Sequence, residues 1–351
     1  MRRLVKGAAA AVGGAVLAAA ATLTALTVTE WWPAERGPVA VARGVDPGAL
    51  PQRLKLVTWN LGYAALDREA DFFMDGGHMS RARSRQDVEA NLAAIVKLLR
   101  AADSDVTLLQ ELDERAHRSC DVPERDTLFA AFPTSFRAFT PNYRVPWVPV
   151  PLFEPMGGVR SGIATLSRAA PLETTSLALP GRFAWPNRLF NLKRVALLTR
   201  QRVPGESGLI VINVHLSAFD KGGWMRREEL AFLRQLLVDE AGSGWSVIAG
   251  GDWNSPLPGT PLHPCPRGRD DRSWLVELPA EWTPPGWRWA VDHESPTVRT
   301  TGAPLNRGST CYAGIDGFLV SPGVEIESAR VMPTGFANTD HLPLVAVIRL
   351  P

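Results

Sequence analysis

The chain has almost no excess of charge of either sign. Its 351 residues carry a formal net charge of +2. This surplus comes from Arg2, Arg3 and Lys6, which precede the first apolar segment, and from Trp31 onward basic and acidic residues are equal in number. A neutral body argues against a protein whose main function is to bind the nucleic-acid backbone through a broad basic face.

The sequence has no repeat of 20 to 50 residues, so the protein is neither a solenoid nor a propeller. Cysteine is also scarce. The three cysteines are Cys120, Cys265 and Cys311, and their spacing resembles no zinc site. Two of them can form a disulfide in an oxidising compartment, which leaves one thiol over and does not fix the pairing. The length allows one large core or two modest ones, and we expect a monomer.

Charge is absent from residues 7–29, and this Ala/Gly/Leu/Val run would span roughly 30 Å as a helix. Positive residues precede it, so we expect a single-pass anchor that leaves the body outside the cytoplasmic membrane. The alternative is a cleaved signal peptide on a secreted protein, because Ala18–Ala21 offer cleavage sites. The sequence predicts an anchor or signal segment at residues 1–29, a Pro/Gly/Ala-rich tether at 30–51 and one folded domain at 52–351.

Hydrophobic patterning predicts an α/β fold built on two strand–helix–strand units. One unit joins the apolar runs 54–60 and 106–112 through a helix that starts near Ser84. The other joins the run 209–216 through a helix at 226–240 to the apolar run 246–249, whose strand carries Asp252. We expect further strands at 161–167, 195–198, 315–320 and 344–350. Right-handed crossovers bring the carboxyl ends of parallel strands to one edge of a sheet.

The stretch GGDWNS, Gly250–Ser255, follows one of these buried strands. Asp252 and Asn254 point the same way if the backbone stays extended, and the glycines before them would let a ligand approach the backbone. Asp and Asn after a strand are also common turn formers. The interpretation as a site therefore depends on what the other strand ends carry.

Strand ends and the last loop carry a set of acids, amides and histidines. The set is Asn60, Glu111, His215, Asp252, Asn254, Asp316, Asp340 and His341. Carboxylate and amide oxygens suit Mg²⁺, with Mn²⁺ as the alternative. In-line phosphodiester hydrolysis needs a base for water, a metal for the developing charge and a donor for the leaving oxygen. The competing interpretation is a surface or capping role for Glu111 and a structural role for His215.

The order of these pieces resembles the endonuclease/exonuclease/phosphatase superfamily, which includes the pancreatic deoxyribonuclease-like enzymes and the neutral sphingomyelinases. The motifs are WN at 59–60, QE at 110–111, SGIATLSR at 161–168, NVHL at 213–216, GGDWN at 250–254, ID at 315–316 and TDH at 339–341. The resemblance covers residues 54–350. It implies a four-layer sandwich of two packed mixed β-sheets flanked by helices. The apolar N-terminus and the MDGG loop resemble a bacterial membrane-anchored branch.

The resemblance also implies a metal-dependent phosphoric ester hydrolase with a defined metal site. Glu111 would be the principal Mg²⁺ ligand, with Asn60 beside it and Asp340 near the metal. One departure from the family pattern is Trp253, where Phe is commoner.

Five further residues take catalytic roles by the same resemblance. His341 would be the general base, oriented by Asp316. His215 would bind phosphoryl oxygens or help to protonate the leaving group. Asp252 and Asn254 would position water and stabilise the pentacoordinate state.

Three cations, Arg160, Lys193 and Arg194, could reach a substrate phosphate, and ordinary surface charge is the competing interpretation. The favoured function is a phosphodiesterase acting on a lipid headgroup or another small phosphodiester, because the anchor, the neutral body and the Trp/Pro-rich stretch 145–153 suit a membrane interface.

The first alternative is an extracellular nuclease that holds phosphates with the arginines of 81–85 and with Arg267, Arg269 and Arg272. The second is a catalytically silent binding module on the same fold. The complete set of acids and histidines speaks against a silent module.

Overall fold

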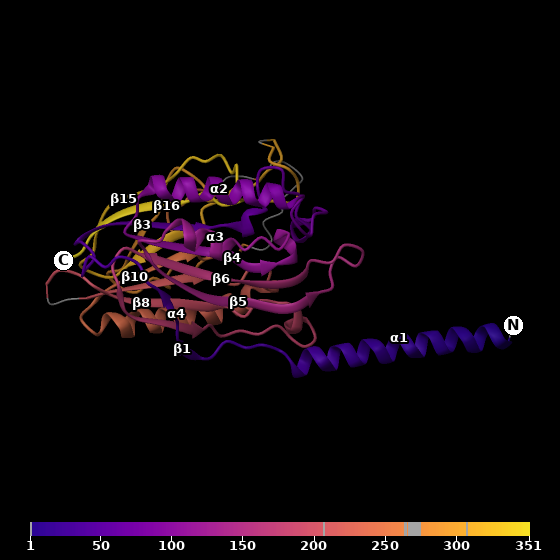
Figure 1. The fold of residues 1–351 in the computed structure, drawn as a ribbon. Coiled ribbons are helices and arrows are strands. Elements are labelled where there is room, and N and C mark those ends of the chain that lie inside the picture. The colour runs from indigo at the N-terminus through magenta and orange to yellow at the C-terminus, as the bar shows by residue number, and fades with distance from the viewer. Residues whose placement is uncertain (1, 206–207, 263–264, 266–274, 307) are drawn as a thin grey trace.

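Two seven-stranded mixed sheets pack face to face (Figure 1). The computed structural model describes residues 2–205, 208–262, 265, 275–306 and 308–351. In spatial order the first sheet contains β1 (Arg36–Pro38), β7 (Pro171–Ala178), β8 (Val195–Arg202), β9 (Gly208–His215), β10 (Ser246–Asp252), β14 (Asp316–Val320) and β11 (Arg288–Ala290). The second contains β15 (Glu325–Val331), β16 (Leu344–Arg349), β3 (Arg53–Asn60), β4 (Val106–Ala116), β6 (Gly157–Ser167), β5 (Phe136–Val148) and β2 (Val41–Ala42). The predicted four-layer α/β sandwich is confirmed.

Helices cover the outer faces of the sandwich. They are α2 (Arg85–Ala102) and α3 (Glu124–Ala131) beside the second sheet and α4 (Trp224–Ala241) beside the first, and Figure 1 shows α2 and α4 on opposite sides of the body. Helix α2 begins where the sequence predicts, because Ser84 Oγ accepts a hydrogen bond from Asp87 N at 3.1 Å. Leu92 of α2 and Leu233 of α4 are buried against their sheets.

The core between the sheets explains the two glycines of GGDWNS. Phe318 and Leu108 meet there from opposite sheets, and a Cβ on Gly250 would lie 2.3 Å from Phe318 Cδ1. At Gly251 the φ angle is +146°, and a Cβ would lie 1.9 Å from the carbonyl oxygen of Val214 on the neighbouring strand. Both glycines therefore permit close packing of protein on protein. The expectation that they admit a ligand to the backbone is wrong.

Strand β5 runs through a proline-containing part of the chain. Pro141 and Pro146 lie within β5, whose outer neighbour β2 has only two residues. Register shifts between β5 and β6 fall at 141–143 and 145–148. Proline is tolerated in a strand that is mostly an edge and irregular in register. Further along the chain β12 (Val298–Arg299) pairs with β13 (Tyr312–Ala313). The candidate phosphate-binding arginines Arg267, Arg269 and Arg272 lie outside the described residues.

The N-terminal part of the chain consists of a helix and a following segment that pairs with both sheets. Within the described residues one helix, α1 (Arg2–Val28), is long and apolar enough to cross a membrane, a character that a signal sequence shares, and Figure 1 shows it projecting from the body. Residues 30–51, predicted as a tether, add β1 to the edge of one sheet and β2 to the edge of the other. This segment is folded onto the body.

The sequence left open which two of the three cysteines form a disulfide, and the structure shows the pair. Cys265 and Cys311 form a disulfide with a Cα–Cα distance of 4.8 Å, and Cys120 stays a half-buried thiol.

Candidate active site

Strand register places three predicted site residues side by side on the first sheet. Asp252 at the end of β10 pairs with His215 at the end of the parallel strand β9 and with Asp316 at the start of the antiparallel strand β14. All three side chains are buried. The central strand therefore carries the acid, with a histidine on one side and a second acid on the other.

The second sheet delivers Asn60 and Glu111 to the same place. Asn60 pairs with Gln110 across the parallel strands β3 and β4, so the predicted common edge is confirmed. Glu111 has a φ of +51° and lies in a register shift of β4, which turns its side chain out of the regular alternation. The amide Nδ2 of Asn60 donates to Glu111 Oε1 at 3.3 Å and to Asp252 Oδ2 at 2.9 Å. One amide thus joins the carboxylates of both sheets.

A buried polar network fixes the two sheets beneath the site. Gln110 Nε2 donates to Asn213 Oδ1 at 2.8 Å, and Asn213 Nδ2 donates to the carbonyl oxygen of Ala164 at 2.8 Å. Both residues belong to short motifs in the sequence, but only the structure reveals that they contact each other. These hydrogen bonds join the two sheets, although Gln110 Oε1 has no hydrogen-bond partner among the described residues.

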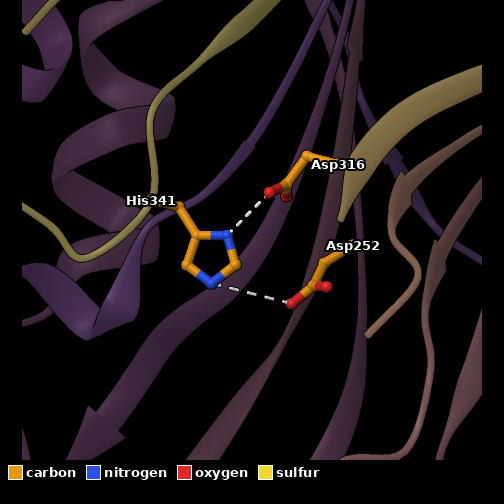
Figure 2. Close-up of side chains that lie close together, drawn as sticks. All are labelled: Asp252, Asp316 and His341. Carbon is orange, nitrogen blue, oxygen red and sulfur yellow. Dashed lines mark hydrogen bonds and ion pairs between the residues drawn. The ribbon is translucent and has the colours of Figure 1, made fainter. Parts of the chain in front are cut away.

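His341 and Asp316 form a hydrogen-bonded pair (Figure 2). His341 Nδ1 lies 2.9 Å from Asp316 Oδ2, and its Nε2 lies 3.9 Å from Asp252 Oδ2. Trp59 Nε1 donates to the His341 carbonyl at 3.0 Å, which anchors the loop. Burial lowers the pKa of His341, but the carboxylates of Asp316 and Asp252 outweigh burial and raise the pKa to about 10. Asp316 therefore orients the ring and leaves Nε2 facing the site.

His215 has the opposite electrostatic character. Its Nε2 lies 3.4 Å from Asp252 Oδ2 and 3.8 Å from Glu111 Oε1. Burial, helped by the positive charge of Arg194, lowers the pKa of His215 well below its usual value. A neutral imidazole gives one N–H as a hydrogen-bond donor and has no extra proton to release. Of its two predicted roles, binding phosphoryl oxygens fits this state.

Asn254 is held by a buried ion pair that the sequence did not single out. Its φ is +48°, and its Nδ2 donates to the Leu216 carbonyl at 2.8 Å. A guanidinium nitrogen of Arg226 donates to the Asn254 carbonyl, and Arg226 also pairs with Asp220 at 2.7 Å. The helix periodicity of 226–240 predicted α4 but gave no reason to expect a charged residue pointing inward.

The predicted residues surround one cavity of about 160 Å³. Asn60, Glu111, His215, Asp252, Asn254, Asp340 and His341 line it, and Asp316 lies behind His341. Apolar side chains form much of its wall: Leu66, Phe72, Met74, Met156, Phe183, Leu192, Phe219 and Met225. The cavity therefore combines a polar floor with an apolar wall.

The three candidate phosphate-binding cations differ in their position relative to the cavity. Arg194 lines the cavity, and its buried Nη1 has no hydrogen-bond partner among the described residues. Burial lowers its pKa. Arg160 instead pairs with Glu114 at 2.6 Å, and Lys193 pairs with Glu30 at 3.2 Å. Arg160 and Lys193 are not among the described residues that line the cavity.

A scan against family models matches residues 57–341 to the Endonuclease/Exonuclease/phosphatase family. The chain belongs to this family. Members of the family are metal-dependent phosphoric ester hydrolases. Among curated proteins, none matches the sequence significantly.

Solved structures of the same superfamily share the fold at low sequence identity. An endonuclease/exonuclease/phosphatase from Beutenbergia cavernae is 21% identical with a TM-score of 0.56, over 85% of this chain and 72% of that one. ANGEL2, described as a 2',3'-cyclic phosphatase, is 16% identical with a TM-score of 0.53, over 90% and 98%. The human Nocturnin catalytic domain with bound sulfate anion is 16% identical with a TM-score of 0.51, over 89% and 98%. At these identities the likeness establishes the fold alone.

The divalent metal that the family implies fits the donor set of this cavity. Glu111, Asp252 and Asp340 bring three carboxylates to one cavity. Burial raises the pKa of Asp252, and it raises that of Asp340 to about 7. Crowded, buried carboxylates are relieved by a hard cation. The ligand atoms of Asp252, Asp316 and His341 also lie within 4.8 Å of one another.

The ligand role predicted for Asn60 stays a prediction. Its amide nitrogen faces Glu111 and Asp252, whereas its oxygen accepts a hydrogen bond from Gly62 N at 3.0 Å. Asp340 Oδ1 accepts from Thr339 Oγ1 at 3.2 Å and has a second oxygen for a ligand.

Proposed function

We propose that the chain is a Mg²⁺-dependent phosphodiesterase that acts outside the cytoplasmic membrane on a phospholipid headgroup or a similar amphiphilic phosphodiester. The observation that carries the proposal is the cavity in which Glu111, Asp252 and the His341–Asp316 pair meet an apolar wall. Mn²⁺ is the alternative cation. The location follows from α1, taken as an anchor with the body on its far side.

His341 is the general base in this proposal. Asp316 holds Nδ1–H, so Nε2 accepts the proton of the attacking water. A bound Mg²⁺, held by Glu111 and Asp340 beside Asn60, would polarise the phosphoryl group and supply the positive charge that keeps the imidazole neutral before proton transfer.

Other residues bind and orient the substrate. His215 donates an N–H to a phosphoryl oxygen, and the unpaired guanidinium nitrogen of Arg194 pairs with the phosphate. Asp252, which already accepts a hydrogen bond from Asn60, positions the water. Asn254, fixed by Arg226, stabilises the pentacoordinate state.

An amphiphilic substrate is favoured over nucleic acid by what surrounds the cavity. Met156 of its wall packs at the base of the β5–β6 connection, where Trp147, Leu152 and Phe153 are exposed, Phe153 by 97%. The described arginines among those proposed to bind nucleic acid form ion pairs: Arg81 pairs with Glu154, Arg83 with Asp67 and Arg85 with Glu89.

A substrate panel tests this proposal. Full-length protein in detergent micelles is assayed with Mg²⁺ on sphingomyelin, phosphatidylinositol, plasmid DNA, RNA and bis-p-nitrophenyl phosphate. We expect phospholipid turnover at a kcat/KM at least about tenfold above that for the small diester, because apolar contacts add binding energy. Nicking of DNA without lipid turnover would replace the lipid assignment by a nuclease, and no turnover of any substrate would favour a silent binding module.

A further inference from the structure

The chain just after α1 is built into the structure that carries the cavity. Glu30 places Oε1 3.2 Å from Lys193 Nζ and Oε2 3.1 Å from Arg188 Nε. The side chains of Glu30 and Lys193 are each 5% exposed. Removing one partner of such a buried pair leaves an uncompensated charge, so the pair holds its two segments together.

Lys193 transmits this attachment to the site. Its Nζ donates to the Arg188 carbonyl at 2.6 Å, and its backbone N–H donates to the Asn142 carbonyl of β5 at 2.7 Å. The next residue, Arg194, lines the cavity. The position of Lys193 therefore fixes where the guanidinium group of Arg194 enters the cavity.

Two tryptophans reinforce the same junction. The ring of Trp32 lies 4.7 Å from Lys193 Nζ and 4.6 Å from Arg182 Cζ. Trp185 Nε1 donates to Thr27 Oγ1 of α1 at 3.1 Å. The segment between these contacts also contributes Phe183 and Leu192 to the cavity wall. Side chains from residues 27–32 thus contact the segment 182–193, which forms part of the cavity wall.

We propose that Glu30 is a positioning residue for the active site, acting through Lys193 to hold segment 187–194 and keep Arg194 directed at the substrate phosphate. The inference rests on the proposed function, which assigns the phosphate to Arg194. It also makes residues on the N-terminal side of the predicted domain boundary part of the catalytic unit. A protein truncated at residue 52 would lack Glu30 and Trp32 together with β1 and β2.

Hydrogen exchange tests the attachment without any substrate. In the full-length chain in detergent, Glu30→Gln is expected to speed exchange of the amides of residues 187–194 about tenfold or more and to leave α2 and β10 unchanged. The matched control is Glu35→Gln, five residues further along at an exposed position, for which no change is expected. Where Glu30→Gln fails to fold, Glu30→Gln/Lys193→Met removes the stranded charge and is expected to fold with the same fast local exchange. Wild-type protection in segment 187–194 of whichever Glu30 variant folds would overturn the proposal.

Kinetics test whether Glu30 acts through Arg194. On bis-p-nitrophenyl phosphate, Glu30→Gln is expected to raise KM about tenfold while kcat changes less than about threefold. Adding Glu30→Gln to Arg194→Met is expected to raise KM no further than Arg194→Met alone. Additive increases in KM, or a loss confined to kcat, would contradict the positioning role. If wild-type protein turns over no phosphodiester, the proposed function fails, and the exchange result still decides the attachment.

Discussion

Glu111→Gln is expected to lower metal-dependent phosphodiester hydrolysis by at least about 10³-fold, because metal-assisted charge stabilisation supplies several kcal/mol and 1.36 kcal/mol is a factor of ten. Glutamine keeps the volume of the side chain and removes the charge that would hold the cation. The measurement is the initial rate of bis-p-nitrophenyl phosphate hydrolysis across a range of Mg²⁺ concentrations, with circular dichroism to verify folding.

The control for this variant is Glu114→Gln on the same strand. Glu114 pairs with Arg125 and Arg160 at partly exposed positions, so its loss is expected to change the rate by less than about threefold. A Glu111→Gln protein with the wild-type rate and metal dependence would remove Glu111 from the metal site.

His341→Asn is expected to lower kcat by about 10²–10⁴-fold, the range that general base catalysis contributes. Asparagine cannot take up the proton of the attacking water. KM is expected to change far less than kcat, because the ring acts on the nucleophile and not on the bound phosphate. Single-turnover kinetics at saturating substrate measure the loss.

His78→Asn is the matched control for His341. The side chain of His78 is 92% exposed and pairs only with Asp71 at the surface among the contacts described. It is expected to keep wild-type kinetics. Equal losses in both histidine variants, or a retained kcat in His341→Asn, would argue against His341 as the base.

Much of the fold follows from local sequence because the strands near the site are mainly apolar. The runs at 209–216 and 344–350 appear as β9 and β16 with boundaries within two residues, and the run at 246–249 forms the first part of β10. Short motifs after these runs then mark the site, since parallel strands end at a common edge. The resemblance to the family supplied the roles, which spacing alone does not give.

What local sequence could not reveal depends on contacts between distant segments. The Asp220–Arg226 pair that holds Asn254, and the Gln110–Asn213 link between the sheets, leave no periodic signal. The glycines before Asp252 looked suited to a ligand, yet Gly250 lies against the side chain of Phe318 on the neighbouring strand of the same sheet.

The N-terminal segment illustrates the same limit. Its proline, glycine and alanine content is typical of a tether. Its two short strands, β1 and β2, pair with the edges of β7 and β5, which are distant in sequence. The composition of the segment does not indicate that it pairs with the edges of the two sheets.

The central claim, that the strand-end acids and histidines hydrolyse a phosphodiester with a divalent cation, is tested most directly by removing and restoring that cation. Full-length protein is treated with EDTA, dialysed and assayed on bis-p-nitrophenyl phosphate while Mg²⁺ is titrated back, with the thermal unfolding midpoint followed in parallel. We predict that hydrolysis falls to background without metal and recovers with saturable dependence on Mg²⁺, while the protein stays folded throughout. Turnover that persists unchanged in EDTA, or a folded protein that no divalent cation activates, would contradict the account.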